Sequence, residues 1–64
     1  MKRRDLEKHL REHGCIFDRA GGQHDIWLNP ILNRRAPVER HREIQPTMVR
    51  EICKQLAIPR PSRK

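Results

Sequence analysis

The sequence has little material for a large hydrophobic interior. Of its 64 residues 34% are hydrophobic, tyrosine is absent, and one phenylalanine and one tryptophan supply all the aromatic side chains. A domain of this size buries only about 60% of the surface that its unfolded chain exposes. So thin a core cannot enclose a large organic cofactor. We therefore expect a single domain over residues 1–58 that needs no small-molecule cofactor, and whose substrate, if it is an enzyme, supplies its own surface.

Long apolar runs and paired cysteines are also missing. No segment reaches the ~18 apolar residues of a membrane span, and no signal peptide is visible. We expect a cytoplasmic protein without a membrane partner. Cys15 and Cys53 lie far apart and outside any CxxC motif. A disulfide is possible in a small secreted protein, but two buried thiols suit a basic cytosolic chain better.

Basic residues are abundant by contrast. Fifteen Lys and Arg, eleven of them Arg, stand against eight Asp and Glu, for a formal net charge of +7. Arg offers a bidentate fork to phosphate and stacks on bases. A basic surface can serve solubility alone, but an excess this large in so short a chain favours a nucleic-acid partner.

Hydrophobic periodicity predicts two helices. Leu6 and Leu10, four residues apart, indicate a helix over residues 3–13. A second helix is predicted over residues 46–57, with Thr47 as its N-cap. Its apolar stripe consists of Val49, Ile52, Cys53 and Leu56.

Three short strands are predicted between the helices, over residues 15–19, 24–29 and 34–38. The pair Gly21-Gly22 is expected to supply positive φ for the first turn, and Pro37 suggests an edge strand. Two helices, each with one apolar stripe, can cover one face of a three-stranded antiparallel sheet. The fold class is therefore α+β, in the order α-β-β-β-α, with the layout of a double-stranded-RNA-binding domain and an open sheet face. Residues 59–64 form a basic tail that we expect to be disordered.

Four segments, taken together and in order, resemble HicA-type (YcfA-family) toxins. They are Lys2-Arg3-Arg4-Asp5-Leu6 through Leu10 with His13-Gly14-Cys15, then Gly21-Gly22-Gln23-His24-Asp25-Ile26-Trp27, then Ala36-Pro37-Val38-Glu39-Arg40-His41, and the final helix with Val49 to Leu56. The resemblance covers about residues 2–58. It implies the same α-β-β-β-α fold, ribonuclease activity on mRNA that inhibits translation, and a HicB-type antitoxin as partner in a type II toxin–antitoxin pair. It also implies that His24 is the catalytic residue. The family often has Ser before this histidine, where this chain has Gln23.

His24 suits the cleavage of RNA, because the 2′-OH beside the scissile phosphate can attack it once a base takes its proton. The two glycines before it, Gly21 and Gly22, keep the turn slim, so an RNA backbone can approach. The alternative is a histidine packed at a strand end, since His24 shares its face with Ile26 and Leu28. His24 cannot accept one proton and donate another in the same step, so a second group, a water molecule or a slow leaving step must serve. His41 is the candidate that the sequence offers, and its alternative is a surface-loop or helix-entry histidine.

No metal site is expected. His9 and His13 are four residues apart on the predicted first helix, but no further ligand stands at a matching spacing. We interpret them as part of a solvated helix face.

Further residues are candidates for binding RNA or a partner. Gly22 and Gln23 flank His24, and five arginines in or beside the strands can cradle phosphates: Arg19, Arg34, Arg35, Arg40 and Arg42. Their alternative role is to guard the sheet edges against aggregation. Trp27 stacks on a base or anchors a partner if its sheet face is open, and is core if that face is covered.

Three functions remain compatible with these features. The first is a metal-independent endoribonuclease toxin, the second a non-catalytic RNA-binding module of the same fold, and the third an interaction protein whose basic faces pair with an acidic partner. The first predicts loss of cleavage on His24→Ala, and the second predicts salt-sensitive RNA binding without cleavage.

Overall fold

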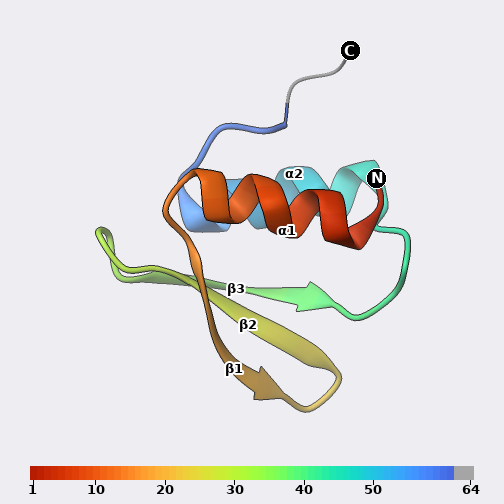
Figure 1. Cartoon of the computed structure of the whole chain (residues 1–64), viewed down its shortest axis with the longest axis horizontal. Coiled ribbons are helices and arrows are strands. Elements are labelled where there is room, and N and C mark those ends of the chain that lie inside the picture. Colours follow the sequence, from red (N-terminus) through yellow and green to blue (C-terminus); the bar gives the residue numbers. More distant parts are fainter. Residues whose placement is uncertain (62–64) are drawn as a thin grey trace.

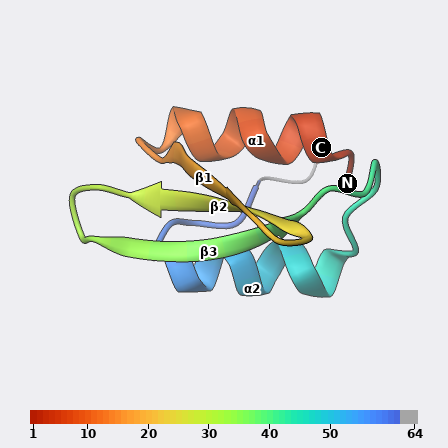
Figure 2. The same ribbon diagram turned by 90° about the horizontal axis from the view of Figure 1, so that it is seen from below.

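The computed structural model describes residues 1–61 and has the predicted element order (Figure 1). Helix α1 (Arg3–Glu12) is followed by β1 (Ile16–Gly21), β2 (His24–Asn29), β3 (Arg34–Glu39) and helix α2 (Pro46–Leu56). The strands form one antiparallel sheet in the order β1-β2-β3. Both helices lie on the same face of this sheet, and the view from below shows the strands in front of them (Figure 2). The predicted fold class is confirmed.

The hydrophobic core lies between the sheet and the two helices. Complete burial of a large apolar side chain stabilises the fold by roughly 1.5–3 kcal/mol, so a small set of residues carries the domain. The predicted stripes of both helices are buried, and Ala36 and Val38 are buried on the side of β3 that faces them. The core residues are Leu6, Leu10, Cys15, Trp27, Ala36, Val38, Ile44, Val49, Ile52, Cys53 and Leu56.

The start of α2 differs from the prediction. The helix begins at Pro46 with Gln45 as its N-cap, so the assignment of Thr47 as N-cap is wrong, and no side chain caps this end. Proline is favoured at the first helical position because its φ is preset for the helix and its missing N–H would have no partner there. The helix ends where Ala57 adopts the left-handed conformation, with φ of 59°.

Strand β1 departs from regular alternation. A bulge between Phe17 and Arg19 shifts the register against β2, and one extra residue in a strand disturbs the alternation of its side chains. Cys15 is 1% exposed and Phe17 is 51% exposed. The alternation of residues 15–19 predicts that Cys15 and Phe17 share one face. Phe17 pairs with Trp27 of the core-facing side and packs against its ring, so this prediction holds, and Phe17 is half-exposed because β1 is an edge strand.

The turn between β1 and β2 also forms in a different way from that expected. Positive φ among the described glycines occurs at Gly14, not at Gly21 or Gly22, so the turn does not use the left-handed conformation of its glycines. Gly21 instead lies within β1, where a Cβ atom would stand 3.3 Å from the Cγ1 of Ile26. Glycine at this position leaves room for the β2 side chain beside it.

Strand β2 has the predicted bounds and the predicted two faces. The face that packs on the helices is the one with Trp27 and Asn29, both buried, whereas Ile26 and Leu28 are partly exposed on the opposite face. His24 shares this second, open face with Ile26. Ile26 and Leu28, although apolar, therefore do not mark the side of the strand that faces the core.

Neither of the two helices has the length and apolar character that crossing a membrane requires, within residues 1–61. Of the tail expected to be disordered, residues 62–64 lie outside the described residues. The carbonyl oxygen of Pro59, at the start of that segment, lies 2.7 Å from Nε2 of His9 on α1.

Candidate active site

Three segments far apart in the sequence meet at one end of the sheet. In an antiparallel sheet the end of β1, the start of β2 and the end of β3 must lie together. His24 accordingly pairs with Gly21 of β1 on one side and with Glu39 of β3 on the other. The loop after β3 runs along the N-terminus of α1, where Lys2 and Glu43 form an isolated antiparallel bridge. This end of the molecule gathers most of the site residues expected from the sequence.

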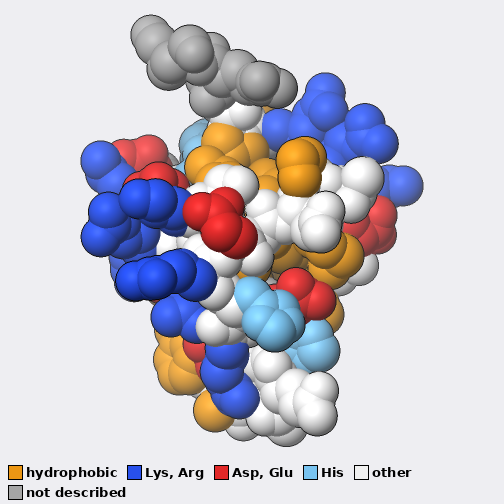
Figure 3. Space-filling view, turned by 90° about the vertical axis from the view of Figure 1, so that its right-hand side faces the viewer, with side chains coloured by type: hydrophobic (Ala, Val, Ile, Leu, Met, Phe, Trp, Pro, Cys, Tyr) orange, Lys and Arg blue, Asp and Glu red, His pale blue; other side chains and the backbone are white. Residues whose placement is uncertain are grey.

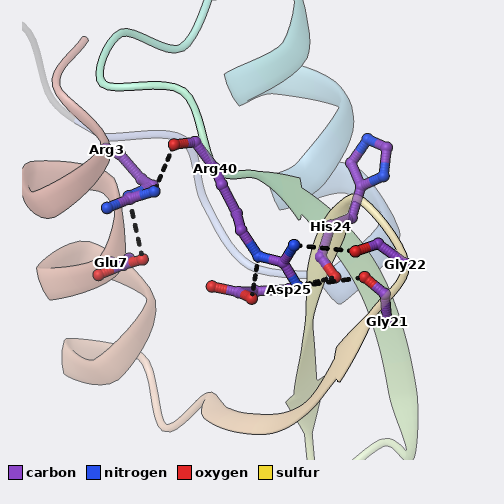
Figure 4. Close-up of polar contacts among 7 residues, drawn as sticks. All are labelled: Arg3, Glu7, Gly21, Gly22, His24, Asp25 and Arg40. Carbon is purple, nitrogen blue, oxygen red and sulfur yellow. Dashed lines mark hydrogen bonds and ion pairs between the residues drawn. The ribbon is translucent and has the colours of Figure 1, made fainter.

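His24 is the first residue of β2 and is partly exposed on the open sheet face. Its β1 partner, Gly21, has no side chain to place beside the imidazole. The imidazole projects away from the cluster of polar contacts at the hairpin end (Figure 4). His24 is therefore not a core histidine, and its ring can meet a ligand that lies across this end of the sheet.

Glu39 is a site residue that the sequence analysis missed. It ends β3 and stands directly opposite His24 in the β2–β3 register. Side chains opposite each other on one face have Cβ atoms about 4.5–5.5 Å apart. No ion pair joins the two side chains among residues 1–61, but a carboxylate at this spacing can orient an imidazole that turns toward it. The predicted third strand ended at residue 38, one residue before Glu39. The pair therefore becomes visible only in the register between β2 and β3.

Arg40 was expected to bind RNA, but its guanidinium is engaged within the protein. Nε donates to Oδ1 of Asp25 at 2.9 Å, NH1 donates to the Gly22 carbonyl at 2.8 Å, and NH2 donates to the carbonyls of Gly21 at 3.2 Å and His24 at 3.3 Å (Figure 4). These contacts hold the hairpin turn and the backbone of His24 together. Arg40 therefore supports the turn that carries His24, and its expected role as an RNA ligand stays a prediction.

A second arginine supports the first. Arg3, at the start of α1, donates from NH1 to the backbone carbonyl of Arg40, and its Nε lies 3.7 Å from a carboxylate oxygen of Glu7 (Figure 4). The backbone N–H of Arg3 also donates to the carbonyl of Arg42 at 2.8 Å. Through these bonds α1 fixes the loop after β3, and that loop in turn fixes the His24 turn.

His41 and Arg42 follow Arg40 in the loop and are exposed. Consecutive Cα atoms are about 3.8 Å apart and paired antiparallel Cα atoms at most about 5.5 Å apart, so the Cα of His41 lies within about 13 Å of that of His24. Figure 3 shows histidine side chains on this side of the molecule, close to many Lys and Arg side chains. The structure thus brings both candidate histidines to one end of the sheet.

The remaining candidate arginines lie elsewhere. Arg34 donates from Nε to the carbonyl of Gln55 at 2.7 Å, so it binds a free carbonyl in the last turn of α2. Arg19 and Arg35 both contact Oδ2 of Asp18, at 3.0 and 3.2 Å. This pair of arginines spans the open face of the sheet, because Asp18 is in β1 and Arg35 in β3.

Trp27 is a core residue, which decides between the two roles left open above. It is 2% exposed, Phe17 packs edge-on against it with ring centroids 6.3 Å apart, and the Arg11 guanidinium lies 5.4 Å from its ring centroid. Its Nε1 has no hydrogen-bond partner among residues 1–61. A base cannot stack on a ring that is almost fully buried, so Trp27 is a core residue and not a stacking platform.

The turn residues beside His24 are open to solvent. Gly22 and Gln23 are exposed, and a Cβ added at Gly22 would meet no atom within 4 Å. The space in front of this turn is therefore free for a bulky ligand. Gln23 takes the position before the histidine without contributing to the core.

The described chain offers neither a metal-ligand cluster nor a reactive thiol. No three His, Cys, Asp or Glu side chains come together within residues 1–61 where they could hold a metal ion. Cys15 and Cys53 are free and buried, as expected. Burial raises the pKa of both thiols, and the neighbouring Cys15 thiolate raises that of Cys53 further, while Arg60 opposes the shift. Both thiols are therefore protonated at neutral pH.

Comparison with known proteins gives one match. A family model described as the HicA toxin of bacterial toxin–antitoxin systems matches residues 3–58. This range includes every element of the fold and every candidate residue described above. Searches of curated proteins and of solved structures each gave no match.

Proposed function

The chain belongs to the HicA toxin family of bacterial toxin–antitoxin systems, and we propose on this premise that it is an endoribonuclease that cleaves mRNA with His24 as its catalytic residue. The observation that carries the proposal is the position of His24: a partly exposed imidazole on the open sheet face, at a turn held rigid by Arg40. A toxin that destroys mRNA stops translation, and a partner that covers His24 would silence it.

The chemistry needs no outside nucleophile. His24 accepts the proton of the ribose 2′-OH, and the 2′ oxygen attacks the adjacent phosphorus as the bond to the 5′ oxygen breaks. The products are a 2′,3′-cyclic phosphate and a free 5′-OH, whose oxygen takes up one proton. Histidine serves this exchange near neutral pH because its unperturbed pKa is about 6.5.

The second proton transfer requires another group. His41 is the candidate acid, because it lies on the same end of the sheet and is exposed to a bound backbone. Glu39, opposite His24, can hold the imidazole in one tautomer and orientation. Arg19 and Arg35, which share Asp18 on the open face, retain N–H donors for phosphates along the sheet.

Membership of the family implies an antitoxin partner, and we propose that it is of the HicB type. The net charge of +7 makes an acidic antitoxin surface complementary to this toxin. The substrate and the antitoxin would then compete for one basic surface around His24.

Cleavage of a purified long mRNA in the presence of EDTA tests the proposal. We expect wild type to cut it and leave cyclic phosphate ends, and His24→Ala to lose at least about 100-fold in rate with an unchanged thermal midpoint. Glu12→Ala, on the exposed outer face of α1, is the matched control. RNA binding without cleavage by wild type would favour the non-catalytic module instead. Normal cleavage by His24→Ala would refute the assignment of the catalytic residue.

A further inference from the structure

A hollow lined only by basic side chains lies beside the candidate active site. It has a volume of about 550 Å³, and its lining residues are Lys2, Arg3, Arg4 and Arg42. The first three come from the start of the chain and the fourth from the loop after β3, so only the folded chain brings them together. The antiparallel bridge between Lys2 and Glu43 and the bond from the Arg3 N–H to the Arg42 carbonyl hold the two segments in place.

The charges in this hollow are largely uncompensated. Lys2, Arg4 and Arg42 form no ion pair with an acidic side chain in the part of the chain that the structure describes, while Arg3 is paired with Glu7. The acidic neighbour of Arg42, Glu43, lies 3.3 Å from the amino group of Met1. Positive charges held close together without counter-charges repel one another, so this arrangement is favourable chiefly when an anion binds between them.

Backbone geometry adds to the attraction. The first-turn amides of Asp5 and Leu6 donate to the Lys2 carbonyl, and that of Arg3 donates to Arg42. The amide of Arg4 has no such partner among residues 1–61. It stands at the positive end of the dipole of the ten-residue helix α1, on the same residue that lines the hollow.

The position of the hollow indicates which anion it binds. Arg42 is three residues beyond Glu39, the partner of His24 in the register, so the Cα atoms of Arg42 and His24 are at most about 17 Å apart. Lys and Arg side chains run across this side of the molecule toward its histidines (Figure 3). A single RNA strand whose scissile phosphate is at His24 therefore reaches the hollow within a few nucleotides.

We propose that Lys2, Arg4 and Arg42, with the Arg4 amide, form a phosphate-binding subsite for the RNA strand, a few nucleotides from the phosphate at His24. The choice of RNA rests on the proposed function. The contacts themselves recognise only phosphate, so they anchor and orient the strand without reading its sequence. Arg3 contributes charge but remains bound to Glu7 and to the Arg40 carbonyl.

The test measures binding in the His24→Ala background, where RNA is not cut. The double variant Arg4→Gln/Arg42→Gln removes two charges from the hollow, and Arg50→Gln/Lys54→Gln removes two exposed charges from α2 as the matched control. The probes are a short single-stranded RNA of mixed sequence and the DNA of the same sequence, each titrated at several salt concentrations. Thermal unfolding checks that both variants fold.

We expect the hollow variant to bind both probes about tenfold more weakly near 0.1 M salt, compared with the control. The slope of log K against log salt should shrink by about 1.4, because each phosphate contact on a single strand contributes about 0.7. Equal loss on DNA and RNA supports a subsite for phosphate alone.

The proposal and the nuclease function can fail separately. A reduced slope would support the subsite even if the chain with His24 intact cuts no RNA. Affinity and slope equal to those of the control would overturn the subsite, even if wild type cuts RNA efficiently. If the hollow variant bound both probes like the control but no longer bound its antitoxin, the hollow would be a contact for an acidic protein and the proposal would be wrong.

Discussion

The contacts of Arg40 predict that its loss disturbs stability and catalysis together. Replacing it by Met removes four hydrogen bonds, to Asp25 and to the carbonyls of Gly21, Gly22 and His24. A net hydrogen bond contributes about 1 kcal/mol, and more when one partner is charged. The side chain is 40% exposed, and water can replace some of these bonds. We therefore expect Arg40→Met to lower the free energy of unfolding by about 2 kcal/mol, and the melting temperature of so small a domain by roughly 8–16 °C.

Arg40→Met should slow catalysis even at temperatures at which the variant remains folded. The His24 carbonyl loses its anchor, so the imidazole is no longer held in one place. A displacement of about 1 Å at a reacting group can cost about 100-fold in rate. We expect kcat to fall roughly 10- to 100-fold with little change in KM. Arg40→Lys should be intermediate, because an ammonium cannot span the carboxylate and three carbonyls as the planar guanidinium does.

The assays are urea unfolding and cleavage of a defined RNA over a range of RNA concentrations that gives both kcat and KM, with Asp25→Asn as a companion variant. If Arg40 braces the turn, Asp25→Asn weakens the brace and lowers both stability and kcat. If Arg40 were instead an RNA ligand, Asp25→Asn would release it and strengthen RNA binding. In that case Arg40→Met would raise KM and leave the unfolding free energy unchanged, and our interpretation of these contacts would be refuted.

Three further predictions concern other parts of the chain. His41→Ala should slow cleavage about 100-fold if His41 is the acid. Thermal stability should not change, because the residue is exposed. An unaltered cleavage rate would show that His41 is only a surface histidine. Asn29→Ala should lower the free energy of unfolding in urea by about 2 kcal/mol. The buried amide donates to the Leu56 carbonyl at 2.8 Å, and its oxygen accepts from the Ile31 N–H. A change within about 0.5 kcal/mol would contradict this role. Cys15 and Cys53 should react with a thiol reagent at pH 8 only when the protein unfolds. Their folded pKa values lie above the ordinary 9.0, so their contribution to the free energy of unfolding should be complete below about pH 9 and decline above it. Rapid labelling of the folded protein would show that the thiols are accessible.

Local patterns in the sequence were sufficient for the elements and their order. Leucines four residues apart and the stripe of α2 reflect the 3.6-residue period of a helix, and β2 was predicted to the residue. Charge and length indicated a polyanionic partner, and four segments taken together indicated the family that the comparison later confirmed. The elements follow from short stretches of chain, whereas charge and length are properties of the whole sequence.

The sequence alone could not decide which face of the sheet is covered. Alternation in β2 separates Ile26 and Leu28 from Trp27, but either set is apolar enough to be core. In the folded chain Trp27 belongs to the core that the helices cover, whereas Ile26 and Leu28 do not. This decision exposes the side of the strand that carries His24.

The roles of the arginines were likewise invisible before folding. Arg34, Arg40 and Arg42 look alike in sequence, yet one binds the end of α2, one braces the His24 turn and one lines the basic hollow. Each role depends on carbonyls or charges that lie near only because the sheet register and the bridge between Lys2 and Glu43 bring them there. The sequence by itself determined the kinds of residue, their elements and the family, whereas tertiary structure decided their partners, because a hydrogen bond or an ion pair forms only between groups that the fold brings within a few ångströms.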